Sequence, residues 1–258
     1  ETSNLKKNLD LCEKVGLNCI VFDARIEGMT ELTTSLIGNG MSQYKDVKAL
    51  SKKIKEMIEP YVDHPAFYGL SIKDEPTCSN FAALGEVYKA VDMINEERVA
   101  AGKNRIYLNC VMLPYVAGRD GNYTSNSINT GKQAYRDYIS QYLTKTGSAS
   151  FDYDSYPFIY AAPETSDEST ILNNYLSNLQ MVSEETSKAG KSFYLTMQSH
   201  SSVRNAEGSA NKRAMTIADF RWQLNAAFSF GVKDLRYYTY WMFPNHSKSG
   251  DPMDKAIM

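Results

Sequence analysis

The segment best suited to carry chemistry is the run from His64 to Pro76, which ends in Lys73, Asp74, Glu75 and the proline. Its apolar residues Tyr68, Leu70 and Ile72 alternate with small or polar ones, as expected of a strand whose side chains point to opposite faces. The apolar set would face helices, and Glu75 would lie on the opposite face, at the carboxyl end of the strand. Functional residues of parallel barrels occupy this end. We therefore predict a functional carboxylate at Glu75, with a plain polar strand exit as the competing interpretation.

Five further segments are predicted as strands, and each turns polar on one face toward its carboxyl end. They are residues 18–24, 105–113, 151–158, 192–198 and 234–241. Parallel barrel strands gather their carboxyl ends at one mouth, so we expect these polar side chains to meet there. Besides Glu75, the candidate residues are Asp23, Arg25, Lys73, Asn109, Asp154, Tyr156, Gln198, His200, Tyr240 and Trp241.

Helical patterns separate these strands. We predict helices at about 3–15, 44–61, 81–101, 135–146, 170–189 and 217–230, and long loops at about 26–43, 114–130 and 200–213. The alternation of strand and helix indicates an α/β fold with a parallel sheet and right-handed crossovers. No strand is followed by a glycine-rich phosphate-binding fingerprint, which disfavours a nucleotide-binding doubly wound fold.

Composition is that of a globular protein, with 258 residues, 43% hydrophobic content and a net charge of -2. This length allows one domain spanning 1–258. The near-neutral charge indicates no nucleic-acid partner, and no apolar run is long enough for membrane insertion. The four cysteines lack metal-ligand spacing, so we expect no metal and no cofactor. Cys19 and Cys110 fall in predicted strands, where a thiol usually behaves as a small apolar group, and a disulfide is the minor alternative.

A mouth lined by carboxylates, amides and tyrosines suits a polyhydroxylated ligand, because tyrosine combines a flat apolar face with a polar tip. Glycoside cleavage needs one protonated carboxyl that donates to the leaving oxygen and a second carboxylate as nucleophile or base. Glu75 is the expected acid, since nearby rings and a second carboxylate raise the pKa of a carboxyl group.

Segments 63–76, 151–158 and 220–244, with the strand ending at Gln198, resemble (β/α)8-barrel glycoside-hydrolase-like proteins of polysaccharide-degrading bacteria, which are related to the clan of retaining glycosidases. The resemblance implies a TIM-type (β/α)8 barrel acting on a poly- or oligosaccharide. It places Glu75 at the end of the fourth strand, where the clan has its acid/base. The first two strands would then be absent from this chain, so we expect it to be incomplete at the amino end and trimmed at the carboxyl end. A second chain or a missing segment would complete the barrel, and we expect a secreted or periplasmic location.

Gln198 stands where the clan has its nucleophilic glutamate, and an amide cannot form the glycosyl-enzyme ester. Three interpretations stay open: an inverting hydrolase with Asp154 or Asp23 as base, a substrate-assisted hydrolase, and a carbohydrate-binding protein without catalysis. A sugar-phosphate or aldol-type enzyme using Lys73 is a weaker alternative. We predict Glu75 and Asp154 as catalytic residues and the other candidates as substrate-binding residues. Aromatic platforms are expected at Tyr156, Tyr240 and Trp241.

Overall fold

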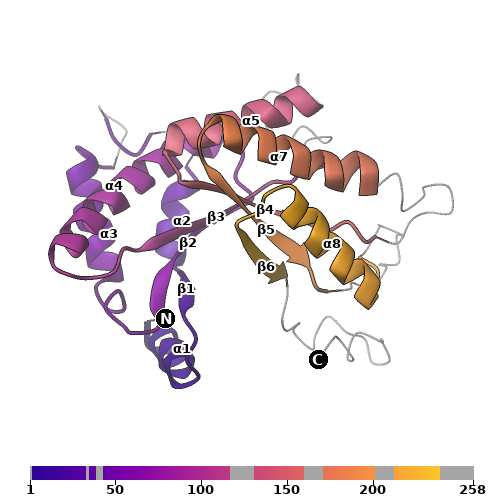
Figure 1. Ribbon diagram of the computed structural model, residues 1–258. Coiled ribbons are helices and arrows are strands. Elements are labelled where there is room, and N and C mark those ends of the chain that lie inside the picture. The colour runs from indigo at the N-terminus through magenta and orange to yellow at the C-terminus, as the bar shows by residue number, and fades with distance from the viewer. Residues whose placement is uncertain are drawn as a thin grey trace, which may run out of the picture. The chain divides into compact units, whose positions relative to one another are not determined.

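The protein has an α/β fold in which parallel strands alternate with helices along the chain (Figure 1). The computed structural model describes residues 2–32, 35–38, 43–116, 131–159, 171–200 and 212–238. Contacts divide the chain into two compact units. The first unit holds the described residues up to Val111 and the segment Gln141–Ser148. The second unit holds the described residues of Met112–Tyr123, Ser127–Ser140 and the chain from Ala149.

In the first unit, three strands pair in parallel in the order β1-β2-β3. The elements are α1 (Thr2–Lys14), β1 (Cys19–Phe22), α2 (Ala24–Thr30), α3 (Val47–Ile58), β2 (Phe67–Asp74), the 3-10 helix η1 (Cys78–Asn80), α4 (Phe81–Ala100) and β3 (Tyr107–Met112). Helix α5 (Lys132–Thr146) is divided between the units, and its residues from Gln141 belong to the first.

The core of the first unit contains the buried face of β2 and the apolar sides of α3 and α4, which lie side by side in Figure 1. Leu70 and Ile72 of β2 are fully buried, and so are Ile54 of α3 and Val87 and Val91 of α4. Burial of apolar side chains is the main favourable contribution to folding. The alternation in β2 therefore fixes which face turns away from the helices.

Two glycines of the first unit stand where backbones approach closely. A Cβ atom on Gly69 of β2 would lie 2.2 Å from the carbonyl oxygen of Tyr107 in β3. A Cβ atom on Gly85 of α4 would lie 2.3 Å from the carbonyl oxygen of Lys145 in α5. Both distances are too short for carbon and oxygen, so an alanine at either position would push backbone segments apart.

In the second unit, three strands pair in parallel in the order β4-β5-β6. Besides the first part of α5, the elements are β4 (Ser150–Ser155), the π-helical η3 (Ile171–Leu176), α7 (Ser177–Lys188), β5 (Ser192–Gln198), α8 (Ile217–Ser229) and β6 (Asp234–Tyr238). Phe151 and Tyr153 of β4, Leu195 and Met197 of β5 and Leu179 of α7 are fully buried. As in the first unit, alternate strand residues make the core.

The predicted α/β class and all six predicted strands are confirmed. The predicted loop at 26–43 was wrong in its first residues, because helix α2 runs to Thr30. Asp23 caps this helix, since its carboxylate accepts a hydrogen bond from the backbone N–H of Arg25 at 3.0 Å. The predicted loops at 114–130 and 200–213 lie largely outside the described residues.

The predicted packing of Tyr68 under a helix was also wrong. Tyr68 is 51% exposed, and its ring lies 5.5 Å from the ring of Tyr107. The reason is an irregularity in the pairing with β1: Cys19 lies opposite Phe67, while Ile20 lies opposite Gly69. In this register Tyr68 lies opposite no residue of β1, and its side chain does not follow the alternation that buries Leu70 and Ile72.

Apolar residues of α1, the following turn and β1 are also exposed, among them Leu11, Val15, Leu17 and Phe22. A second chain or missing segment that completes the barrel stays a prediction, and so does a single domain over the whole chain. Among the described residues, no helix is both long and apolar enough to cross a membrane.

Candidate functional site

The carboxyl end of β2 carries a strained backbone at Glu75. This exposed residue has a φ of 45°, and it is the one residue other than glycine with positive φ among the described positions. Its N–H donates to the carbonyl oxygen of Val111 at 2.7 Å, and Pro76 follows directly. A left-handed conformation in a residue with a side chain costs on the order of 1–3 kcal/mol, and such residues cluster at functional sites. The predicted acid therefore stands where the chain departs from relaxed geometry.

Asp74, the last residue of β2, is a second carboxylate at this point of the chain. The surrounding protein partly removes water from its carboxyl group, which raises the pKa of Asp74, although the residue remains exposed and Lys73 opposes the shift. A raised pKa favours the protonated form, which is the form that a general acid needs. Sequence reasoning did not select Asp74, although its position beside Glu75 was the available signal.

Lys73 is engaged by helix α2. Its Nζ atom lies 2.5 Å from a carboxylate oxygen of Glu31 and 3.9 Å from one of Glu27, and the side chain is 11% exposed. These ion pairs hold the Lys73 side chain between β2 and α2. Its predicted role in binding substrate is untested.

Asp23 and Arg25 form a closed cluster with Tyr61. The Asp23 carboxylate accepts hydrogen bonds from Nε and Nη2 of Arg25 at 2.9 and 2.6 Å and from the Tyr61 hydroxyl at 2.7 Å. Burial alone would raise the pKa of Asp23, but these hydrogen bonds outweigh it and hold the pKa below its usual value. A carboxylate satisfied in this way is a poor base. Two structural roles of Asp23 account for this cluster: it caps α2, and it accepts the hydrogen bond from the Tyr61 hydroxyl.

Asn109 is the remaining candidate of the first unit. It lies in β3 opposite Ser71 of β2, with 9% of its surface exposed. Both residues belong to the polar parity of their strands, as predicted. The pairing of Asn109 with Ser71 gives the two strands a polar face. The predicted contact of Asn109 with substrate is untested.

In the second unit, Asp154 lies in β4 opposite Thr196 of β5 and is half-buried. Two residues earlier, the buried Asp152 accepts a hydrogen bond from Arg236 of β6 at 3.1 Å. The guanidinium of Arg236 also lies 5.6 Å from the ring centre of Tyr194. One face of these three strands is thus polar along its length, while the predicted catalytic role of Asp154 stays untested.

Gln198 has its amide group occupied by backbone groups. The side chain is fully buried, and its oxygen accepts from the N–H of Phe158 at 2.9 Å. Its Nε2 donates to the carbonyl oxygens of Phe158, His200 and Arg213 at 3.0–3.2 Å. This arrangement ties the chain after β4 to the chain around β5. These hydrogen bonds explain why this residue is an amide. A contact with substrate is therefore not needed to account for Gln198, and the predicted contact is untested.

Three rings and a cation gather at the carboxyl ends of β4, β5 and β6, in what we call the histidine–tyrosine cluster: Tyr156, His200, Lys212 and Tyr238. The His200 ring stands edge-on to Tyr156 at 5.2 Å and to Tyr238 at 5.1 Å, and the two tyrosine rings lie 5.8 Å apart. Lys212 Nζ lies 5.6 Å from the ring centre of Tyr156. Tyr156 and His200 were predicted, whereas Tyr238 and Lys212 were missed as site residues.

The proton of His200 is placed by its surroundings. Nδ1 lies 2.7 Å from the carbonyl oxygen of Tyr238, which can only accept, so Nδ1 carries the hydrogen. Burial and the charge of Lys212 lower the pKa of His200, and the hydrogen bond to Tyr238 opposes this only in part. The neutral ring therefore presents the Nε2 lone pair as an acceptor, for instance for a ligand hydroxyl. The predicted platforms Tyr240 and Trp241 lie outside the described residues.

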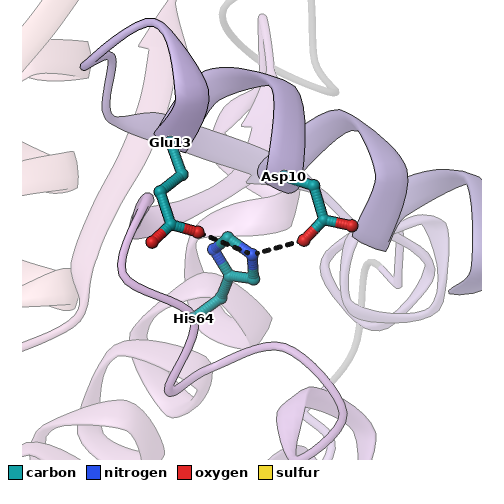
Figure 2. Close-up of side chains that lie close together, drawn as sticks. All are labelled: Asp10, Glu13 and His64. Carbon is teal, nitrogen blue, oxygen red and sulfur yellow. Dashed lines mark hydrogen bonds and ion pairs between the residues drawn. The ribbon is translucent and has the colours of Figure 1, made fainter.

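Asp10, Glu13 and His64 offer the ligand types of a metal site, and their ligand atoms lie within 4.8 Å of one another (Figure 2). Nε2 of His64 lies 3.1 Å from Asp10 and 3.7 Å from Glu13. However, Nδ1 of His64 accepts a hydrogen bond from the N–H of Ala66 at 3.2 Å, which places the ring proton on Nε2. A nitrogen that carries a proton cannot ligate a metal. The geometry fits a clamp in which His64 donates to Asp10 and holds α1.

Comparisons with known proteins add little to this geometry. No family model matches the sequence, and no curated protein matches it. One similar solved structure is a proposed alpha-L-fucosidase from Bacteroides thetaiotaomicron VPI-5482, with 10% identity, a TM-score of 0.46 and coverage of 78% of this chain and 57% of that one. Another is a uronate isomerase from Bacillus halodurans C-125, with 12% identity, a TM-score of 0.36 and coverage of 71% and 42%. The chain thus spans little more than half of the first and less than half of the second.

Proposed function

We propose that the protein is a glycoside hydrolase-like protein that acts on an oligo- or polysaccharide, with Glu75 as general acid. The observation that carries the proposal is the strained backbone of Glu75 at the carboxyl end of β2. Strain of this kind persists only where the surrounding structure holds it, and it is typical of functional positions. Here the strained residue follows β2 directly and is the one that the sequence resemblance assigns as acid.

The proposed reaction is hydrolysis of a glycosidic bond. The Glu75 carboxyl donates its proton to the bridging oxygen as the bond from that oxygen to the anomeric carbon breaks, and water supplies the group that adds to that carbon. A second carboxylate must take a proton from the water in an inverting enzyme. Asp23 is disfavoured for this role by its hydrogen bonds from Arg25 and Tyr61. Asp154 remains our candidate base.

The experiment is a screen of polysaccharides and aryl glycosides with the wild type and single variants. Glu75→Gln should lower the hydrolysis rate by about 10²-fold or more while ligand binding persists, because positioned acid catalysis contributes that much. Asp74→Asn tests the neighbouring carboxylate, and Glu59→Gln at the end of α3 is an exposed control. Asp154→Asn tests the base. Loss of activity in Asp74→Asn with full activity in Glu75→Gln would move the acid to Asp74.

A second candidate function is carbohydrate binding without catalysis, and the histidine–tyrosine cluster favours it. Tyr238 is 50% exposed, and an exposed ring beside a hydrogen-bond acceptor suits the apolar face and hydroxyls of a sugar. Tyr237 is a matched control, since it is 49% exposed but stacks on Phe220 instead. Calorimetric titration should show weaker glycan binding for Tyr238→Ala and wild-type binding for Tyr237→Ala. Binding that survives in Glu75→Gln without turnover in the wild type would select this function.

The proposal also concerns location, because an enzyme for external glycans must reach them. We propose that the protein is secreted or periplasmic. Fractionation of the source cells, followed by detection of the chain in each fraction, tests this. Recovery in the cytoplasmic fraction alone would contradict it.

A further inference from the structure

Helix α3 and the residue before its cap carry a row of exposed lysines. Residues 45–55 contain five lysines and one aspartate, whereas the whole chain has a net charge of -2. Lys45, Lys48 and Lys52 are exposed and follow one another at spacings of three and four residues, which places them along one side of the helix. We call these three residues the lysine ridge. The buried residues of α3 lie on a different side of the helix.

The charges of the lysine ridge are not neutralised by the described part of the chain. Among the described residues, no carboxylate forms an ion pair with a ridge lysine. The nearby acidic groups are engaged elsewhere: Asp46 accepts from the N–H of Ala49 at 2.8 Å, and Glu56 lies 3.7 Å from Lys53. Two of the ridge lysines are four residues apart, and like charges at this spacing lower the stability of a helix. Local stability therefore does not account for the ridge, whereas an anionic partner does.

A groove between α3 and α4 adjoins the ridge at Lys52. Its volume of about 550 Å³ is typical of ligand sites, and Ile58 and Ile94 contribute apolar surface to its walls. Charged groups of the walls pair with each other, as Lys55 does with Glu97 at 2.5 Å. The groove therefore offers a partly apolar bed beside a row of cations that are not neutralised.

We propose that the lysine ridge and the adjoining groove bind an anionic polysaccharide, whose acidic groups contact the lysines while a sugar unit enters the groove. A chain of acidic sugars presents a row of negative charges, so its charge is complementary to the ridge. Lysine suits such a ligand, because its ammonium group is a compact charge on a flexible stem. A membrane surface has no part that enters a groove. This inference rests on the proposed function, which makes a glycan the ligand, and it adds the acidic class of that glycan.

The test measures binding of polygalacturonate by calorimetric titration. It uses the full chain with Glu75→Gln, so that the polymer stays intact during the titration. The ridge variant adds three substitutions: Lys45→Gln, Lys48→Gln and Lys52→Gln. It should bind about tenfold more weakly than its parent, since each exposed ion pair contributes only modestly. The difference should shrink at high salt, because salt screens exposed charges.

The control variant changes the same number of exposed lysines on helix α1: Lys6→Gln, Lys7→Gln and Lys14→Gln. Asp10 and Glu13 lie between these lysines in the sequence, so α1 does not form a row of cations. The control lowers the net charge as much as the ridge variant does, and it should bind polygalacturonate like the parent. Equal losses in the two variants, or no loss in the ridge variant, would overturn the proposal.

Further titrations distinguish the class of ligand. Dextran, a single-stranded oligonucleotide and phosphatidylserine vesicles should each bind more weakly than polygalacturonate, and tighter binding of any of them would overturn the proposal. Hydrolysis of a neutral glycan without binding of polygalacturonate would overturn this inference and leave the proposed function standing. Ridge-dependent binding of polygalacturonate, with no glycan hydrolysed by the wild type, would support this inference and contradict the proposed hydrolysis.

Discussion

The carboxyl ends of the strands differ between the two units. In the first unit two charged candidates are engaged by neighbouring side chains: Asp23 by Arg25 and Tyr61, and Lys73 by Glu31. In the second unit the strand ends also carry rings that contact one another, with His200 between Tyr156 and Tyr238. A polar residue at the end of a strand is therefore not evidence of a site by itself. What matters is whether capping and internal pairing already account for it.

Glu75 and Gln198 sharpen this comparison, because both were selected as residues at strand ends. Gln198 is fully buried and makes several hydrogen bonds to the backbone. Glu75 is exposed and strained. The first arrangement stabilises the fold, and the second has a conformational cost that is typical of functional positions.

The largest expected effect is that of Gln198→Glu. A carboxylate there would face the carbonyl oxygens of Phe158, His200 and Arg213 without a donor for them, and its charge would be buried. We expect the free energy of unfolding to fall by about 3–5 kcal/mol, and no retaining activity to appear. Urea denaturation at pH 7 measures the first result and a glycoside assay the second. A stable and active variant would show that this position is catalytic rather than structural.

A smaller effect is expected for Asp23→Ala in the first unit. It removes the cap of α2 and the acceptor of the buried Tyr61 hydroxyl, so the free energy of unfolding should fall by about 2–3 kcal/mol. Asp46→Ala is the matched control, since Asp46 caps α3 through Ala49 in an exposed position, and about 1 kcal/mol is expected there. Thermal unfolding compares the two. Equal losses would mean that the contact with Tyr61 contributes nothing.

Relief of strain is expected for Glu75→Gly. Glycine adopts positive φ freely, and this gain exceeds the cost of its flexibility, so the free energy of unfolding should rise by about 0.5–1 kcal/mol while activity is lost. Asp74→Gly, one residue earlier in β2, should be destabilising because it removes a side chain from a regular strand. Chemical denaturation distinguishes them. A destabilised Glu75→Gly would mean that the side chain supports the fold.

The smallest effect concerns pH. The pKa of His200 is lowered in the folded protein by burial and by Lys212, so the unfolded chain binds more protons between the folded pKa and about 6.5. Stability should therefore be complete above pH 6.5 and decline as the pH falls below it. His200→Gln should remove this decline, and a series of melting temperatures from pH 7.5 to 5 measures it. A decline that persists in the variant would assign it to another group.

Much of the fold could be predicted because it depends on local patterns. Alternation identified all six strands, and it correctly buried Leu70 and Ile72. The prediction failed at Tyr68, where an irregular pairing with β1 breaks the alternation, and at α2, where a loop was predicted although Asp23 caps a helix. The pairing register of a strand depends on residues that are distant in sequence, and a helix cap depends on which of several local roles a residue takes. The pattern within one segment therefore does not predict either feature.

The amino-acid sequence by itself determined the order of strands and helices, the burial of Leu70 and Ile72 in β2 and the placement of a carboxylate before Pro76. These follow from side-chain periodicity and backbone restrictions, which act over a few residues. Only the tertiary structure decided which polar residues serve the fold through helix capping and internal hydrogen bonds. It also placed the proton of His200 on Nδ1. Hydrogen bonds and contacts of this kind depend on distances in space, and the separation of two residues along the chain does not fix them.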